Sequence, residues 1–124
     1  MIRAHRLAPH PFEGWWREAV HRPGEKRQGL HLLGALDEVG WHRVPADVSY
    51  RLAEGGPVSI TVSPDGRVAR PYRLIRAGDS ATVPWGQIQA LTCLGSAALL
   101  VVTLTPDCAL TERELMPDNW FPAR

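Results

Sequence analysis

Hydrophobic and polar residues alternate over short stretches of this chain, and Gly, Pro and Asp residues separate one stretch from the next. A period of two is typical of half-buried β-strands, and no segment sustains the 3.6-residue period of an amphipathic helix. The run at 97–105, rich in β-branched residues, predicts a buried strand. The pattern predicts ten strands, over residues 14–21, 28–34, 39–44, 48–53, 57–63, 67–74, 80–83, 88–94, 97–105 and 110–115.

The clearest hairpin joins Val58–Val62 to the segment that begins at Arg67. Both strands alternate apolar and polar residues, and Pro64-Asp65-Gly66 between them predicts a type I turn with the glycine in the left-handed conformation. Ten short strands separated by turns fit a closed barrel or a jelly roll, in which few strand edges are exposed. The sequence therefore predicts an all-β fold with little helix.

Size and charge narrow the class of protein. The 124 residues are enough for one domain with a core that needs no disulfide, and 14 basic residues nearly balance 13 acidic ones. That balance gives no indication of a nucleic-acid or anionic-membrane partner. No apolar run approaches the roughly 20 residues that span a bilayer, and residues 1–6 lack the apolar core of a secretion signal. We therefore expect a cytoplasmic protein, with Cys93 and Cys108 reduced, although a disulfide between them stays open.

A turn of the Pro-x-Gly type, formed around Pro84 and Gly86, lies between two apolar segments. Proline fixes φ and glycine can adopt a positive φ without a Cβ clash, so Gln89 is expected at the start of the returning strand. With Gly78 these residues resemble the second signature motif of the cupin superfamily. That motif runs Gly, five residues, Pro-x-Gly, two residues, a metal-binding His, three residues and Asn. Here Gln89 stands at the His position and Cys93 at the Asn position.

The first cupin motif also has a counterpart. That motif runs His-x-His, three or four residues, Glu, six residues, Gly; His42 and Gly55 fit its two ends, while Val44 replaces the second His and Val48 the Glu. Counting Gln89, three of the four ligand positions have lost a metal-binding side chain. A catalytic divalent metal normally has about three protein ligands. The resemblance therefore implies a cupin barrel that works with no metal and no cofactor.

A narrower resemblance, to the small cupin group known as "cupin 5", spans roughly Leu7 to Pro117. That group shares a His-Pro start followed by two aromatics and Arg-Glu, then a His-Arg block, a Gly-x-Pro, a Pro-Asp-Gly hairpin and a late Thr-x-x-Pro segment. The corresponding residues here are His10-Pro11, Trp15-Trp16-Arg17-Glu18, His42-Arg43, Gly55-Gly56-Pro57, Pro64-Asp65-Gly66 and Thr103–Pro106. The resemblance implies a single cupin-like domain over residues 1–124, with its core at about 7–117, and a homodimer.

Valines in place of metal ligands make the barrel interior more apolar, and an apolar pocket with a few convergent polar groups is the usual small-molecule site. We expect His42 to act as the general base and Tyr50 as an acid or hydrogen-bond donor. Arg51 or Arg17 is expected to hold a carboxylate or an enolate-like oxygen. The residues expected to line the pocket are Trp15, Trp16, Arg17, Glu18, Val44, Val48, Trp85 and Gln89.

Each of these residues also has a purely structural interpretation. His42 can be a hydrogen-bonded imidazole of the core, and Arg17 and Glu18 can form an ion pair at the barrel rim. The tryptophans can pack in an ordinary core. His31 is expected to point to the opposite face of its strand from its leucine neighbour Leu32.

Two functions stay open on this sequence. The first is a metal-independent isomerase, epimerase, dehydratase or cyclase that acts on a small organic molecule with one acid–base pair. The second is a non-catalytic sensor or carrier that keeps only the ligand pocket. A purely structural or regulatory dimer is a third option.

Overall fold

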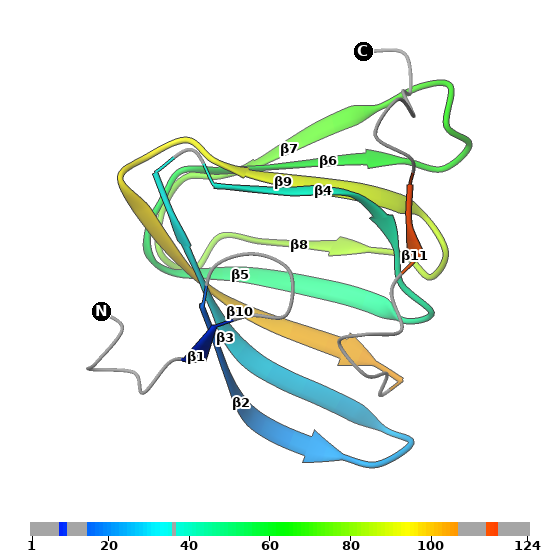
Figure 1. The fold of residues 1–124 in the computed structure, drawn as a ribbon, viewed down its shortest axis with the longest axis horizontal. Helices are drawn as coiled ribbons and strands as arrows, with labels where there is room; N and C mark the ends of the chain where they lie inside the picture. The colour runs from blue at the N-terminus through cyan, green and yellow to red at the C-terminus, as the bar shows by residue number, and fades with distance from the viewer. Residues whose placement is uncertain (1–7, 10–14, 36, 107–113, 117–124) are drawn as a thin grey trace.

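The fold is built of β-strands in the part of the chain that the structure describes, which comprises residues 8–9, 15–35, 37–106 and 114–116 of a computed structural model. Eleven strands form two antiparallel sheets that face each other across a common interior (Figure 1). Within those ranges there is no helix whose length and hydropathy would let it cross a membrane. The predicted all-β architecture is confirmed.

The six-stranded sheet lies at the bottom of Figure 1. Its spatial order is β1-β2-β3-β10-β5-β8, and each neighbouring pair is antiparallel. A hairpin joins β2 to β3, whereas β10 returns from late in the chain to lie between β3 and β5. The strands are β1 (Ala8–Pro9), β2 (Trp15–Arg22), β3 (Lys26–Gly34), β10 (Ala97–Thr105), β5 (Asp47–Gly55) and β8 (Ser80–Val83).

The five-stranded sheet lies above it in the order β11-β4-β9-β6-β7. Here β9 is the inserted strand, since it pairs with β4 on one side and with β6 on the other. The chain therefore passes between the two sheets several times, as expected of a jelly roll. The strands are β11 (Glu114–Leu115), β4 (Glu38–Arg43), β9 (Ile88–Cys93), β6 (Val58–Ser63) and β7 (Arg70–Leu74).

The main hydrophobic core fills the space between the two sheets. Strand alternation sends every second side chain inward, so Leu52 and Leu100 from the lower sheet meet Ile60 and Leu91 from the upper one, and all four are at most 2% exposed. Burial of a side chain of this size stabilises the fold by about 1.5–3 kcal/mol. The interior of the barrel is therefore mainly apolar, and any polar group in it requires an explanation.

Strand positions agree closely with the alternation pattern, with one informative difference. The hairpin strand predicted from residue 67 begins only at Arg70. The carboxylate of Asp65 accepts hydrogen bonds from the backbone N–H groups of Arg67 and Val68, which extends the turn by several residues. Gly66 has a φ of 78°, as its predicted left-handed position requires.

The two ends of the chain differ from the predicted strands. Strand β1 was not predicted, and of the predicted strand 110–115 only 114–115 lies within the described residues.

Candidate functional site

A β-bulge in β4 decides which side chains of this strand enter the barrel. Val39 pairs with Leu91 and His42 pairs with Gln89, so two residues of β4 lie opposite the single residue between those partners on β9. Side chains of a regular strand alternate between its two faces, and an extra residue of this kind shifts that alternation by one position beyond the bulge. As a result Val39 and His42 both point inward, at 3% and 4% exposure, although they are three positions apart.

The imidazole of His42 is oriented by the bulge itself. Its Nδ1 atom lies 2.7 Å from the carbonyl oxygen of Gly40. A carbonyl oxygen can only accept a hydrogen bond, so Nδ1 carries the proton and Nε2 is the basic nitrogen of the neutral ring. Backbone carbonyls commonly fix the tautomer of functional imidazoles in this way. The predicted general base therefore has a defined tautomer and an enclosed position.

Gln89 and Tyr50 complete a small polar group beside His42. Gln89 is the cross-strand neighbour of His42 in the upper sheet, and the Tyr50 hydroxyl donates a hydrogen bond to Gln89 Oε1 from β5 in the lower sheet. Gln89 is 1% exposed and Tyr50 5%. A buried amide requires hydrogen-bond partners, and this bond also connects the two sheets through the interior. The structure thus brings together three predicted site residues that are far apart in sequence.

Two valines at former ligand positions belong to the apolar core that includes Tyr50. Val44 and Val48, the residues at the second His and Glu positions of the first cupin motif, are 8% and 1% exposed and belong to the same core cluster as Tyr50. Val48 pairs with Val83 on one side and Leu104 on the other. An apolar wall of this kind strengthens electrostatic interactions of the polar groups that it encloses. Both valines are therefore core residues, and their role as lining of a ligand pocket stays a prediction.

Arg51 does not join the other candidate catalytic residues. It follows Tyr50 directly on a regular strand, and because successive side chains alternate between faces, Tyr50 points inward while Arg51 is exposed on the outer face. The expectation that Arg51 converges with Tyr50 and His42 is corrected on this ground. Trp85 lies on the turn after β8 and is 57% exposed, with its backbone N–H donating to Asp47 Oδ1 at 2.7 Å.

Glu18 forms its ion pair with Arg27, at 2.8 Å between Oε1 and Nη1. Its strand register places it in one row with Gly29, Val102 and Tyr50 across four strands, which puts it on the inward face. The ion pair expected between Arg17 and Glu18 stays a prediction, since the ion pair described for Glu18 has Arg27 as its partner. The side chains of Trp15, Trp16 and Arg17 lie outside the part of the structure that is described.

His31 is a second buried imidazole that the sequence analysis did not assign to the site. It is 5% exposed and pairs with Leu100, whose side chain is in the core, so it faces inward from β3. Its orientation away from Leu32 agrees with the prediction, since Leu32 packs with Leu99 in a separate cluster. Alternation within 28–34 places His31 and Leu33 on one face, so the apolar Leu33 was the signal in the sequence that could have placed His31 inward.

The donor set of the interior does not fit a catalytic divalent metal. Such a metal needs about three ligands, whereas the first-motif and second-motif positions offer one imidazole, at His42, and one amide oxygen, at Gln89. That amide oxygen already accepts a hydrogen bond from Tyr50. Among the side chains that the structure describes, no three His, Cys, Asp or Glu residues gather as metal ligands would. Cys93, which replaces the motif's Asn, is a buried free thiol.

Comparison with solved structures identifies the fold as that of the cupins. A hypothetical protein from Leishmania major superimposes with a TM-score of 0.82 at 18% identity, over 96% of this chain and 86% of that one. The Cnp3 cupin domain of Schizosaccharomyces pombe gives 0.64 at 18% identity, over 75% of this chain and 64% of that one. Oxalate decarboxylase gives 0.73 at 13% identity, over 84% of this chain and 28% of that one. No protein-family model and no curated protein matches the sequence.

Proposed function

We propose that this cupin barrel binds a small organic molecule in its interior and catalyses a metal-independent proton transfer on it. The observation that carries the proposal is the orientation of His42, whose Nδ1–H is held by the Gly40 carbonyl. Its basic Nε2 is enclosed in an apolar barrel beside Gln89 and Tyr50. Imidazole is the side chain that proteins use most often as a general base.

The proposed chemistry uses the three polar side chains in separate roles. His42 removes a proton from a carbon next to a carbonyl group and returns it to the other face or to a neighbouring atom, which gives epimerisation or isomerisation. The amide N–H groups of Gln89 are the donors proposed for the enolate-like oxygen that develops, and the Tyr50 hydroxyl holds this amide in place by donating to its Oε1. The valines at 44 and 48 exclude water from this position. Dehydration and cyclisation need the same acid–base pair.

A non-catalytic carrier or sensor is the second candidate, and one observation favours it. The Tyr50 hydroxyl and the Gln89 amide oxygen bond to each other, so each meets a hydrogen-bonding requirement of the other without a ligand. This arrangement is also compatible with a core in which the buried polar groups bond only to each other and have no catalytic role. Turnover therefore has to be tested separately from binding.

Hydrogen–deuterium exchange at substrate carbon separates the two candidates. The full chain is incubated in D₂O with a panel of small enolisable keto acids and keto sugars, and deuterium incorporation is followed by NMR. We expect His42→Ala to slow exchange by about 100-fold or more, the usual contribution of a general base. Arg51→Ala is the matched control, because Arg51 is exposed on the outer face and should leave the rate unchanged.

Three results of the exchange experiment would each count against one part of the proposal. Ligand-dependent protection from thermal unfolding without any exchange would favour the carrier over the enzyme. Exchange that is as fast in His42→Ala as in the parent protein would contradict the assignment of the base. Exchange lost equally in Arg51→Ala would contradict an interior site.

The closer kinship with the "cupin 5" group, and the homodimer it implies, form part of the same proposal. The resemblance of motifs along the chain supports them. Light scattering on the eluting protein is expected to give twice the chain mass of 13.7 kDa. A monomer at every concentration tested would count against this part of the proposal without touching the interior site.

A further inference from the structure

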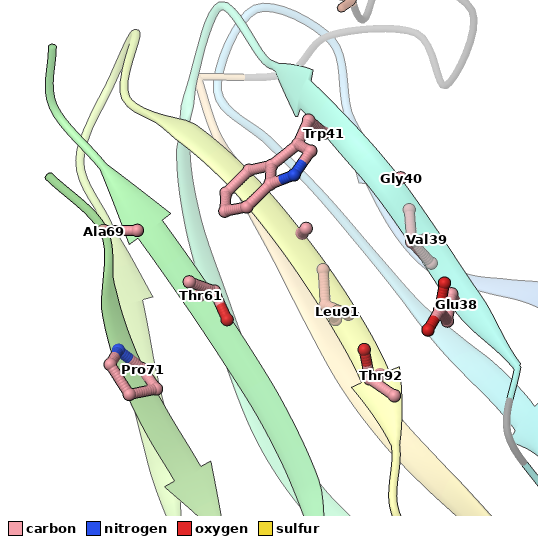
Figure 2. A pocket seen from close by; sticks show the side chains of 10 residues that line it. Glu38, Val39, Gly40, Trp41, Thr61, Ala69, Pro71, Leu91 and Thr92 are labelled. Carbon is pink, nitrogen blue, oxygen red and sulfur yellow. The ribbon is translucent and has the colours of Figure 1, made fainter. Parts of the chain in front are cut away.

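The outer face of the five-stranded sheet carries a hollow that the proposed interior site does not use. It encloses about 400 Å³, within the range of about 300–1,000 Å³ that is usual for small-molecule pockets. Figure 2 shows it between β4 and β6, with β9 as its floor. The sheet itself separates this hollow from the barrel interior, because Val39 and Leu91, which also border the hollow, belong to the hydrophobic core between the sheets.

The hollow exists because one cross-strand row consists of small residues. Ala90 lies opposite the bulge of β4 and pairs with Thr61 on β6, which in turn pairs with Pro71 on β7. Gly40, in the bulge, adds no side chain, and a Cβ placed there would meet no atom within 4 Å. Large residues at these positions would fill the depression, so its depth is encoded by this row.

Trp41 forms the apolar wall of the hollow. A regular strand that points Val39 inward would also point residue 41 inward, and the bulge sends Trp41 to the outer face instead. Figure 2 shows its indole extending across β9 toward β6, over the row of small residues. An aromatic ring laid along an open depression offers one apolar face to a ligand.

A polar row runs beside this apolar one. Register places Glu38, Thr92, Ser59 and Arg73 next to each other across four strands, on the same outer face. Glu38 and Thr92 line the hollow, together with the hydroxyl-bearing Thr61. The row therefore offers a carboxylate acceptor at one end, hydroxyl groups in the middle and a guanidinium donor at the other end.

We propose that this hollow, which we call the outer groove, binds a pyranose ring of a neutral saccharide. The C–H face of such a ring is apolar and packs on an indole, while its hydroxyl groups lie at the edge of the ring and both donate and accept hydrogen bonds. Trp41 supplies the first contact, and the polar groups of Glu38, Thr92 and Thr61 supply the second. The carboxylate of Glu38 disfavours an anion in the groove, and the hydroxyl groups of Thr61 and Thr92 disfavour a wholly apolar ligand.

The test uses the full chain with ¹⁵N-labelled tryptophan and three disaccharides as probes: cellobiose, maltose and lactose. We expect a saturable shift of the Trp41 indole N–H signal with at least one probe, with a Kd on the order of 1 mM. Trp41→Ala should weaken binding about tenfold or more. Gly40→Val should weaken it similarly, because the new side chain enters the groove without meeting other atoms at its Cβ.

Trp85→Ala is the matched control, since Trp85 is an exposed tryptophan on a turn and its loss should leave the affinity unchanged. Circular dichroism of Gly40→Val establishes that the fold is retained. The proposal is overturned by an absence of any saturable shift up to about ten times the expected Kd. It is also overturned if tetramethylammonium shifts the signal and no disaccharide does, or if Gly40→Val binds as tightly as the parent chain.

Discussion

His42 Nδ1 donates to the carbonyl oxygen of Gly40, two residues earlier in the same strand, over 2.7 Å. Within a regular strand, residues two apart point to the same face and their side chains do not bond back in this manner. The bond depends on the bulge that places both Gly40 and Trp41 opposite Ala90. One inserted residue therefore turns His42 inward, fixes its tautomer and sends Trp41 to the outer groove.

Deleting Gly40 should remove the bulge without exchanging the two faces of β4. Val39, Trp41 and His42 would then pair in regular register with Leu91, Ala90 and Gln89, so Val39 and His42 would still point inward and Trp41 outward. The hydrogen bond from His42 Nδ1 to the Gly40 carbonyl would be lost, so we expect a loss of about 1–3 kcal/mol in the free energy of unfolding, measured by chemical denaturation. Gly40→Ala, which keeps the bulge and adds a Cβ in open space, should change stability by less than about 1 kcal/mol. A loss of about 5 kcal/mol or more on deletion would show that the faces of β4 depend on the bulge itself.

Removing the Tyr50 hydroxyl should destabilise the fold, because Gln89 loses a hydrogen-bond donor. Tyr50→Phe leaves the buried Gln89 Oε1 without this donor, which should cost about 1–3 kcal/mol. Gln89→Met in the Tyr50→Phe background replaces both polar groups, so the double variant should recover part of that loss. The coupling energy from the double-mutant cycle measures the inter-sheet bond. A cycle that closes to zero within error would mean that the two side chains do not act as a pair.

The carboxylate of Asp79 should make stability depend on pH. Its Oδ2 accepts hydrogen bonds from the backbone N–H groups of Arg76 and Ile75, both at 2.9 Å. These bonds, that of Arg76 first, hold the pKa of Asp79 below its usual value of 3.8. A carboxyl group whose pKa is lower in the folded state stabilises the fold above its unfolded pKa, and this contribution is lost as pH falls through the folded pKa.

Asp79→Asn should accordingly lower the melting temperature at neutral pH, and the difference from the parent protein should shrink in acid below pH 3.8. Asp65→Asn provides a second case, because the backbone N–H groups of Arg67 and Val68 lower the pKa of Asp65 in the same way. Thermal unfolding followed by circular dichroism across the acid range measures both. If the difference in melting temperature between variant and parent stays constant with pH, the effect comes from altered turn geometry and not from the charge of the carboxylate.

Most strands could be predicted from the sequence, because the alternation of apolar and polar residues that marks a strand is a local pattern. Alternation gave the position of β5 and with it the inward direction of Tyr50, and the Pro84–Gly86 turn gave the start of β9 and the buried position of Gln89. The same alternation places Arg51, the neighbour of Tyr50, on the outer face, so strand geometry excludes it from the interior even though its position near the first cupin motif suggests a site residue.

The bulge and the outer groove could not be predicted from local pattern. A bulge changes parity only relative to a partner strand, and β9 is separated from β4 by more than forty residues of sequence. The small residues of the groove, Ala90, Thr61 and Gly40, are each unremarkable alone and become a depression only when register aligns them. The pairing of Glu18 with Arg27 similarly depends on the β2–β3 register.

The last prediction concerns Gly95, where the loop between β9 and β10 meets the loop between β5 and β6. A Cβ at Gly95 would lie 2.1 Å from the carbonyl oxygen of Gly56, so an added methyl group must displace backbone. Because backbone cannot move aside as a flexible side chain does, Gly95→Ala should cost about 3 kcal/mol. Gly78→Ala is the control: its φ of 97° is strained for alanine but a Cβ there meets nothing within 4 Å.

Chemical denaturation of the two variants separates steric from conformational cost at this end of the barrel. Strain from the positive φ alone should cost Gly78→Ala about 1 kcal/mol, well below the cost at Gly95. The backbone bonds from Gly56 N–H to the Ala97 carbonyl and from Leu94 N–H to the Pro57 carbonyl, both at 2.9 Å, hold the two loops together. If Gly95→Ala is as stable as Gly78→Ala, these loops can separate freely, and close packing of the loops is not what closes this end of the barrel.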